Sequence, residues 1–238
     1  MFAYEHHVGA VDVAFTDRFG GASGAPVDEL NLAVGSDDPR VPENIERVRA
    51  AFGSGDRWVH LRQVHGADVY RADVAAGAAP FPEADAALTT QHGVTLSIRA
   101  ADCVPVLLAD PDRGVIAAAH AGRAGMVRGV VGETVRAMRA AGAREIQAWI
   151  GPHICGRCYE VPEAMRAEVA DDLPQAWAQT SWGTPALDLG AGVRHQLEQE
   201  SVLAHEVGRC TLESDDLFSY RRDGRQAGRH AGLIRIRP

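Results

Sequence analysis

The stretch RAADCVPVLLADPDRGVIAAAHAGRAGMVRG, residues 99–129, contains two apolar runs separated by a Pro-Asp-Arg-Gly turn. Short apolar runs bounded by turn residues are typical of buried strands, so the stretch predicts a β-hairpin. Cys103 stands where the first strand should begin and His120 where the second should end, which places both side chains at one edge of the hairpin. Three glycines then let the chain turn into a helix: Gly122, Gly125 and Gly129.

A Cys and a His at a shared edge have two interpretations. Thiolate and imidazole are ligands for transition metals, but a lone Cys in a strand is usually a small buried hydrophobe and a lone His a hydrogen-bonded structural residue. A third ligand would favour the metal site. His65 is the candidate, because the pattern predicts strands at Trp58–Val64 and Ala67–Ala72 with His65 at the tip of the hairpin between them.

Periodicity elsewhere indicates alternating strands and helices. We expect strands at Val11–Thr16, Glu145–Ile150, Leu203–Thr211 and Ala231–Ile236, and helices at Pro42–Phe52, Met126–Ala140, Pro162–Val169 and Leu189–Leu203. No linker or repeat divides the 238 residues, so one domain spanning 1–238 is expected.

Composition excludes several classes of function. A net charge of −8 without a basic cluster argues against a nucleic-acid partner. The chain has no apolar run long enough to span a membrane and no signal-peptide pattern at its start, which predicts a cytoplasmic location and no membrane partner. The oligomeric state stays open, and a monomer is compatible with the sequence.

All 24 basic residues are arginine, because the sequence contains no lysine. Schiff-base chemistry, pyridoxal-phosphate attachment and the P-loop are therefore excluded, since each requires a primary amine. A bound phosphate would be held by arginine and backbone amides. The candidate substrate contacts are Arg18, Arg62 and Arg123, with the amides after Gly122, and Asn31 as a hydrogen-bonding residue in a loop.

The chain has four cysteines, of which Cys155 and Cys158 form a single C-x-x-C motif. The motif follows Gly151-Pro152 in an expected loop, and no second pair completes a four-cysteine site. A structural or incidental role is favoured over a redox role. These two residues are not expected to bind the metal held by His65, Cys103 and His120.

Five motifs taken together resemble one known family. They are QVHGADV at 63–69, ADCVPVLLAD at 101–110, AAHAG at 118–122, GPHICGRCYEV at 151–161 and FSYRRDG at 218–224. The chain resembles the "laccase domain" proteins, also called the YfiH or peptidoglycan-editing-factor family, which are regarded as zinc-dependent purine nucleoside phosphorylases. Two positions depart from the family pattern: Arg123-Ala124 stands where Trp-Arg is common, and Arg157 replaces the first of two adjacent cysteines.

The resemblance implies an α+β fold, a layered α/β/β/α sandwich with mixed sheets. It implies that His65, Cys103 and His120 are the metal ligands and the catalytic centre. It also implies phosphorolysis of adenosine, inosine or methylthioadenosine to base and ribose 1-phosphate, with adenosine deamination as a side activity. The residue types agree, because two imidazoles and one thiolate suit Zn²⁺ and leave a fourth position open, as in catalytic sites.

The sequence is also compatible with other functions. A peptidoglycan-precursor editing hydrolase would use Cys103 as nucleophile and His120 as base. A copper polyphenol oxidase would need several Cu²⁺ sites, for which one three-ligand set and four scattered cysteines are insufficient. A non-enzymatic binding module would have little use for an open metal site. The acid/base residue is not assigned; Asp102 is adjacent to Cys103 but on the opposite face of an extended chain.

Overall fold

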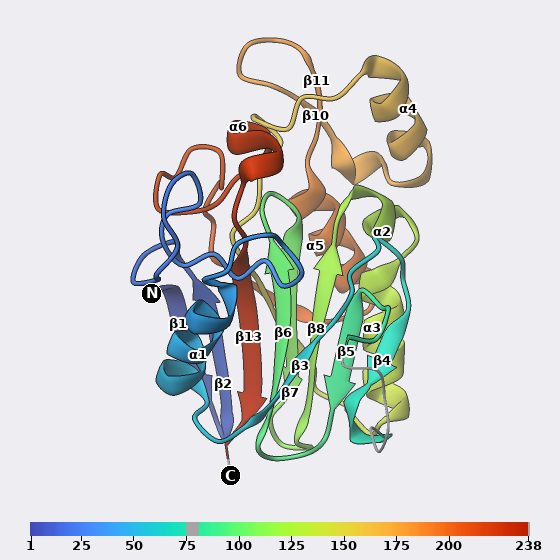
Figure 1. Ribbon diagram of the computed structural model, residues 1–238. Coiled ribbons are helices and arrows are strands. Elements are labelled where there is room, and N and C mark those ends of the chain that lie inside the picture. The colour runs from blue at the N-terminus through green and yellow to red at the C-terminus, as the bar shows by residue number, and fades with distance from the viewer. Residues whose placement is uncertain (75–80, 238) are drawn as a thin grey trace.

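Two β-sheets stacked face to face between helices form the core of the computed structural model, which describes residues 1–74 and 81–237 (Figure 1). The five-stranded sheet has the order β1-β2-β13-β6-β3 and the six-stranded sheet the order β12-β9-β7-β8-β5-β4. Both sheets are mixed, since most pairs are antiparallel but β3–β6, β4–β5 and β9–β12 are parallel. The expected α/β/β/α layering is confirmed.

The bounds of the elements are as follows. The five-stranded sheet contains β1 (Phe2–Val8), β2 (Val11–Thr16), β13 (His230–Ile236), β6 (Val94–Ala100) and β3 (Arg57–His60). The six-stranded sheet contains β12 (Leu203–Glu206), β9 (Gln147–Ile150), β7 (Val104–Asp110), β8 (Val115–Ala121), β5 (Ala86–Thr89) and β4 (Val69–Arg71). The helices are α1 (Val41–Phe52), α2 (Arg123–Val127), α3 (Val130–Ala140), α4 (Glu163–Asp172), α5 (Leu189–Gln199) and α6 (Tyr220–Asp223). Short 3-10 turns lie at Ala72–Val74, Pro174–Ala176 and Gly224–Gln226, and β10 (Trp177–Gln179) pairs with β11 (Pro185–Leu187).

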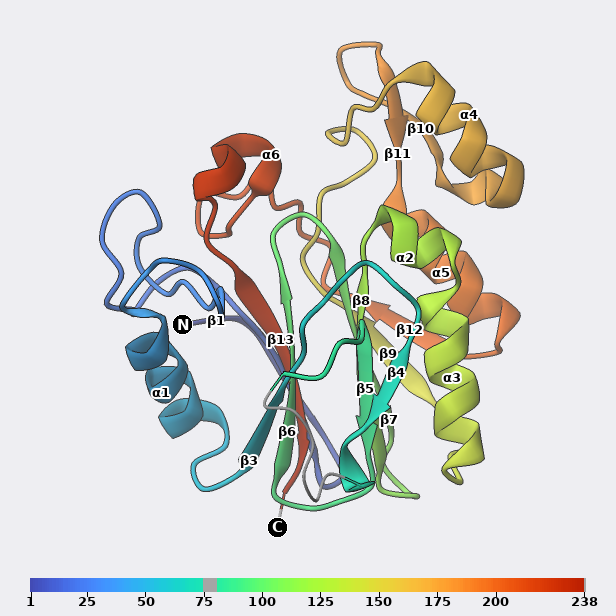
Figure 2. The ribbon, with the colours of Figure 1, turned by 45° about the vertical axis from the view of Figure 1, so that its right-hand side comes forward.

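Alternate residues of each central strand enter different apolar layers. Leu107 of β7 packs between the sheets with Phe15 of β2 and Ile98 of β6, whereas Val106 and Leu108 face the helical side. Figure 2 shows α3 and α5 over the outer face of the six-stranded sheet and α1 over that of the five-stranded sheet. Because both faces of β7 and β8 are covered, every residue in them is buried, which explains why all of them except Asp110 and His120 are apolar.

The predicted hairpin at residues 104–121 is confirmed. β7 and β8 pair antiparallel, with Val104 opposite Ala121 and Asp110 opposite Val115. The register places Pro105 opposite His120, so Cys103 and His120 lie at the same edge of the sheet. This edge carries the site described below.

The second predicted hairpin, Trp58–Val64 with Ala67–Ala72, is wrong. β3 pairs with β6 in the five-stranded sheet, whereas β4 pairs with β5 in the other sheet. The chain between them crosses from one sheet to the other, so these two strands, although adjacent in sequence, do not pair. His65 therefore lies in a crossover segment, not at a hairpin tip.

Other boundaries also differ. The single helix predicted at Met126–Ala140 is two helices, since Gly129 takes a left-handed conformation with φ 80° between α2 and α3. The strand predicted at Leu203–Thr211 ends at Glu206, two residues before Gly208 with φ 69°. Strands β1, β5, β6, β10 and β11 were not predicted. Over residues 1–74 and 81–237, no helix is long and apolar enough to cross a membrane.

Candidate metal centre and active-site cavity

The structure brings together the three residues expected to bind metal. One donor atom each from His65, Cys103 and His120 lies within 4.8 Å of the other two. The Nε2 atom of His65 is 3.9 Å from the Sγ atom of Cys103, and the two imidazole rings lie edge to face with centroids 4.9 Å apart. Donors from three separate segments thus face one small volume.

The backbone at His65 is held in an unusual conformation. Its φ of 60° is uncommon for a residue other than glycine and costs free energy that the surroundings must offset. The buried carboxylate of Asp85 accepts three amide hydrogen bonds from this segment, at 3.0 Å from Val64, 3.0 Å from His65 and 2.7 Å from Gly66. Arg128 donates to the His65 carbonyl at 2.9 Å. The crossover segment is therefore preorganised before any ligand binds.

Asp85 also orients His120. Its Oδ1 atom lies 2.8 Å from the Nδ1 atom of His120, and both side chains are buried. A carboxylate on one imidazole nitrogen directs the other nitrogen outward, which is the arrangement typical of metal-binding histidines. Asp85 was not predicted as a functional residue. The signal that would have suggested it is a carboxylate directly before an apolar strand, in the EADAAL segment at 83–88.

Glycine at position 122 is required by the same geometry. A Cβ atom there would lie 2.5 Å from Cδ2 of His65 and 3.1 Å from Sγ of Cys103. The backbone between β8 and α2 can therefore approach the donors closely only without a side chain. The glycine turn in the sequence is thus part of the site.

Charges within the group are strongly coupled. Burial would raise the pKa of the Cys103 thiol, but the adjacent His120 and His65 lower it to about 6. Burial would likewise lower the pKa of His120, but Cys103 and Asp85 raise it to about 9. A thiolate is therefore favoured at Cys103 near neutral pH, and the thiolate is the form that binds metal. The donor set of one thiolate and two imidazoles, backed by Asp85, fits a transition-metal ion such as Zn²⁺.

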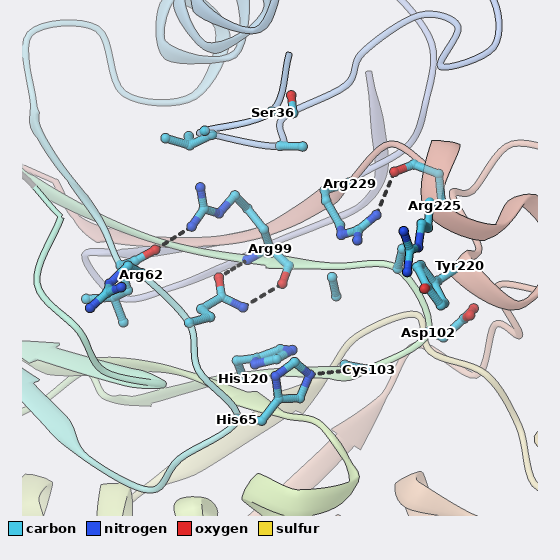
Figure 3. A pocket seen from close by; sticks show the side chains of 18 of the residues that line it. Ser36, Arg62, His65, Arg99, Asp102, Cys103, His120, Tyr220, Arg225 and Arg229 are labelled. Atoms are coloured by element: carbon cyan, nitrogen blue, oxygen red, sulfur yellow. Dashed lines mark hydrogen bonds between the residues drawn. The ribbon is translucent and has the colours of Figure 1, made fainter. Parts of the chain in front are cut away.

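The three donors line a cavity of about 1020 Å³ (Figure 3). In the close-up, the His65–Cys103–His120 group lies on one side, with Arg99 and Arg229 across from it and Tyr220 and Arg225 at one end. Five arginines line the cavity: Arg62, Arg99, Arg221, Arg225 and Arg229. Among the described lining residues Asp102 is the one carboxylate, so the cavity is strongly cationic apart from the metal group.

Arg99 is the arginine best placed to bind an anion. Its Nη2 atom donates to the Leu61 carbonyl, while its Nη1 atom is buried with no hydrogen-bond partner. Within the described chain, no carboxylate forms an ion pair with it. Burial and the positive charge of Arg229 lower the pKa of Arg99 to about 10, so it stays a cation at neutral pH. Leaving a buried guanidinium N–H unpaired is costly, so a small movement of the Arg99 side chain towards an anion in the cavity would be favoured.

Gln63 links this arginine to the metal group. Its side-chain amide donates to the Arg99 carbonyl at 2.8 Å and accepts from the Arg99 amide at 3.0 Å. The crossover segment that carries His65 is thereby attached to strand β6. Arg99 and Arg229 were not predicted, because nothing in their local sequence indicates which face of a strand meets the cavity.

The predicted substrate contacts are distributed unevenly. Arg62 lines the cavity, but it is exposed and ion-paired with Glu83. Arg18, Asn31 and Arg123 are not among the lining residues. Arg18 donates to the Asp28 carbonyl and lies over the ring of Phe218. Asn31 is buried, where it bonds Asp38 and accepts from the amides of Ala33 and Arg229.

Arg123 begins α2, a helix of five residues beside the glycine turn.

Asp102 has a structural role and not that of an acid or base beside the metal group. Its carboxylate accepts from the Thr211 hydroxyl and the Arg221 amide, both at 2.6 Å. It therefore fixes the first turn of α6, the helix that carries Arg221.

Comparison of the sequence with known proteins identifies its family. The family model described as "Multi-copper polyphenol oxidoreductase laccase" matches residues 12–237. The chain belongs to this laccase-like family. It is 52% identical to a purine nucleoside phosphorylase of Streptomyces coelicolor, over 98% of this chain and 99% of that protein. It is 44% identical to a purine nucleoside phosphorylase of Corynebacterium glutamicum, over 92% of each chain.

Solved structures of the laccase-like family have the same fold. Protein NMB0706 of Neisseria meningitidis superimposes with a TM-score of 0.87 at 32% identity, covering 99% of each chain. YlmD of Geobacillus stearothermophilus gives a TM-score of 0.84 at 31% identity, over 96% of this chain and 93% of that one. The similarity therefore covers both sheets and all the segments that build the cavity.

Proposed function

We propose that this protein is a zinc-dependent purine nucleoside phosphorylase, which converts a purine nucleoside and phosphate to the free base and ribose 1-phosphate. The observation that carries the proposal is a single cavity that combines a metal-capable group with a buried, unpaired guanidinium at Arg99. Relatives that are 44–52% identical and named purine nucleoside phosphorylase support it.

Phosphate is assigned to the arginine side of the cavity. Arg99 has a free Nη1, and Arg229 and Arg225 have no carboxylate partner within the described residues. Two backbone carbonyls, of Ala227 and Gly228, accept from the guanidinium of Arg229 and hold it in place. Cations that converge on one cavity bind phosphate through charge-assisted hydrogen bonds and would orient one of its oxygens towards C1′ of the ribose.

The nucleoside would occupy the space between these arginines and the metal group. Apolar side chains in the lining provide surfaces for a purine ring: Leu61, Phe81, Ile154 and Leu189. As the phosphate oxygen bonds to C1′, the bond from C1′ to the purine nitrogen breaks and the base leaves with that electron pair. The site must therefore stabilise negative charge on the base.

Zinc bound by His65, Cys103 and His120 would supply Lewis acidity towards an oxygen or nitrogen of the substrate. Asp85 keeps the His120 ring oriented through its Nδ1 atom, and Gln63 keeps the His65 segment at a set position relative to Arg99. Both residues act by orienting the groups around the reaction: Asp85 lies outside the cavity lining, whereas Gln63 is part of it. We assign zinc because of the mixed thiolate and imidazole donors.

The metal-binding groups of this chain do not fit the oxidase activity in the family description. A multicopper oxidase needs a blue-copper site and a cluster of several further copper ions. The described residues provide two groups with metal-binding potential, one of which contains no histidine. A hydrolase with Cys103 as nucleophile is the alternative that a covalent adduct at this residue would support, and adenosine deamination remains a prediction. Free cysteines and nucleoside substrates favour a cytoplasmic location.

Product analysis with purine nucleosides tests the proposal directly. Adenosine, inosine and methylthioadenosine are incubated with the purified protein with and without inorganic phosphate. Base and ribose 1-phosphate should form with phosphate only. Release of free ribose at the same rate without phosphate would show a hydrolase instead.

A variant of the arginine tests the phosphate assignment. Arg99→Met should raise the KM for phosphate about 10–100-fold, the loss expected for charge-assisted hydrogen bonds, with zinc content unchanged. Arg113→Met is the matched control, because Arg113 is an exposed residue in the turn between β7 and β8. An unchanged phosphate KM in Arg99→Met would place phosphate elsewhere.

A further inference from the structure

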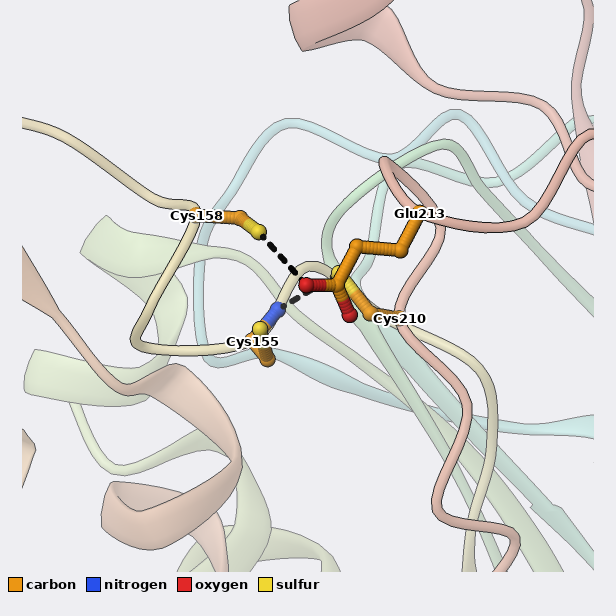
Figure 4. A group of neighbouring side chains, drawn as sticks. All are labelled: Cys155, Cys158, Cys210 and Glu213. Atoms are coloured by element: carbon orange, nitrogen blue, oxygen red, sulfur yellow. Dashed lines mark hydrogen bonds between the residues drawn. The ribbon is translucent and has the colours of Figure 1, made fainter. Parts of the chain in front are cut away.

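A second group of metal-capable residues lies outside the cavity. Cys155, Cys158, Cys210 and Glu213 each place a donor atom within 4.8 Å of the others (Figure 4). None of the four lines the cavity. Local sequence shows only the C-x-x-C half of this group. The third thiol belongs to Cys210, which lies 55 residues after Cys155.

The fold holds the two halves together independently of the sulfur atoms. His153 donates its amide to the Arg209 carbonyl at 3.2 Å and accepts from the Thr211 amide at 3.0 Å, which forms a short parallel bridge. Cys210 is itself the partner of His153 in this bridge, and Cys155 lies two residues after His153. The amides of Cys158 and Tyr159 both donate to the Cys155 carbonyl, so the C-x-x-C segment is a tight turn with its two sulfurs on one side.

Contacts at the sulfur atoms are those of ligands rather than of apolar packing alone. The Cys155 amide donates to Sγ of Cys210 at 3.4 Å, so this sulfur accepts a hydrogen bond in addition to its apolar contacts. Sγ of Cys158 lies 3.5 Å from Oε1 of Glu213, while the other oxygen of that carboxylate is 3.8 Å from the Arg157 guanidinium. In Figure 4 the three sulfurs and the carboxylate face a common centre.

We propose that Cys155, Cys158, Cys210 and Glu213 bind a second zinc ion, which has a structural role. Three thiolates and one carboxylate complete four-coordination, the pattern of closed structural sites, and soft sulfur donors select Zn²⁺ over Mg²⁺ or Ca²⁺. On binding, each thiol releases its proton to solvent and donates a sulfur electron pair to the metal. Ile154, packed beside Cys158 and Cys210, covers the buried side.

The site lies directly behind the wall of the cavity. Ile154 and Tyr159, on either side of the C-x-x-C turn, both line the cavity. Arg221 lies over the Tyr159 ring at 4.9 Å and donates to the Glu160 carbonyl at 2.7 Å. A metal that joins the turn to the segment around Cys210 would therefore fix the position of these lining residues without contacting the substrate.

Metal analysis of the full chain tests the proposal. Wild type and variants are incubated with excess Zn²⁺, freed of unbound metal by gel filtration, and analysed for zinc per chain. Wild type should hold two zinc ions, Cys210→Ser one, Cys103→Ala one, and the double variant none. One zinc ion in wild type that Cys210→Ser retains would overturn the proposal.

Two further variants separate loss of a ligand from loss of packing. Cys210→His keeps a donor and should retain the second zinc, whereas Leu212→Ala removes an apolar neighbour but no donor and should also retain both ions. In Cys103→Ala loaded with Co²⁺ alone, the remaining ion should show the intense sulfur-to-cobalt absorption of several thiolates. Absence of that band would contradict the proposal. A mass lower by two hydrogens, from a disulfide among the three cysteines, would identify a redox group instead.

Discussion

The two sulfur-containing groups differ in access and in number of donors. His65, Cys103 and His120 provide three donors that line the cavity, whereas Cys155, Cys158, Cys210 and Glu213 provide four that do not. Three protein ligands leave a coordination position for substrate, and four close it. The comparison teaches that position relative to the cavity, more than residue type, distinguishes a reactive site from a structural one.

The thiols themselves differ for the same reason. Burial would raise the pKa of Cys103, but two neighbouring imidazoles lower it to about 6. In the second group, burial and the adjacent thiols raise the pKa of Cys158 well above its usual value, and they raise that of Cys155 as well. Cys103 is therefore ready to react or bind metal, whereas Cys155 and Cys158 stay protonated until a metal displaces their protons.

The largest expected effect is at Cys103. Cys103→Ala should remove the metal from the cavity group and lower kcat/KM for nucleosides by more than about 10³-fold, or roughly 4 kcal/mol of barrier. Zinc analysis and phosphorolysis assays check this, with Cys155→Ser as the control that should keep metal in the cavity group. Full retention of that metal, with a covalent substrate adduct on the wild-type cysteine by mass spectrometry, would identify Cys103 as a nucleophile.

A smaller effect should follow from Asp85→Asn. Loss of the carboxylate removes the acceptor that orients His120 and weakens the hold on the His65 segment. Metal affinity of the cavity group should fall about 10–100-fold, as for other residues behind metal ligands, while the second group keeps its metal. Competition with a chromophoric chelator measures both. Asp68→Asn is the control, since Asp68 is exposed, and an equal loss there would argue against the assignment.

Glu213→Gln should weaken zinc binding at the second group by about tenfold, or roughly 1.4 kcal/mol. The loss is smaller than for Cys210→Ser because Glu213 is exposed and water can take its coordination position. Chelator competition on Cys103→Ala, which leaves only the second group loaded, isolates the effect. A loss as large as that of Cys210→Ser would mean that the carboxylate is as essential as a thiolate.

Acid sensitivity of the fold sets the pH range in which the two groups can be compared. Burial lowers the pKa of His230 to about 4, with Arg229 contributing, although the nearby Pro152 carbonyl opposes the shift. The folded state thus favours neutral His230, so its contribution to stability is complete above about pH 6.5 and is lost as pH falls towards 4. At pH 5.5 the loss is about 1 kcal/mol.

Denaturant unfolding at several pH values measures this contribution. His230→Gln should flatten the decline in the free energy of unfolding between pH 6.5 and 4. Part of the decline should remain, because burial and the charge of Arg99 also lower the pKa of His60 to about 4. An unchanged slope in His230→Gln would show that His230 does not control acid stability, and metal release below pH 6 would then report the sites alone.

The sequence by itself determined the β7–β8 hairpin, because two adjacent apolar runs joined by a turn pair locally and their register follows from the turn. It determined the residue types at positions 65, 103 and 120, and with them the metal hypothesis. It also determined family membership, since motifs spread over the chain carry that similarity. All of these depend on patterns that lie within short segments.

Only the tertiary structure decided how distant segments meet. His65 reaches Cys103 because the chain crosses between sheets, Asp85 approaches His120 through the β5–β8 pairing, and Arg99 faces the cavity from the other sheet. Cys210 joins the C-x-x-C turn through a backbone bridge that no spacing rule predicts. The physical reason is that each of these contacts depends on how two separately formed sheets stack, which many weak apolar contacts decide together.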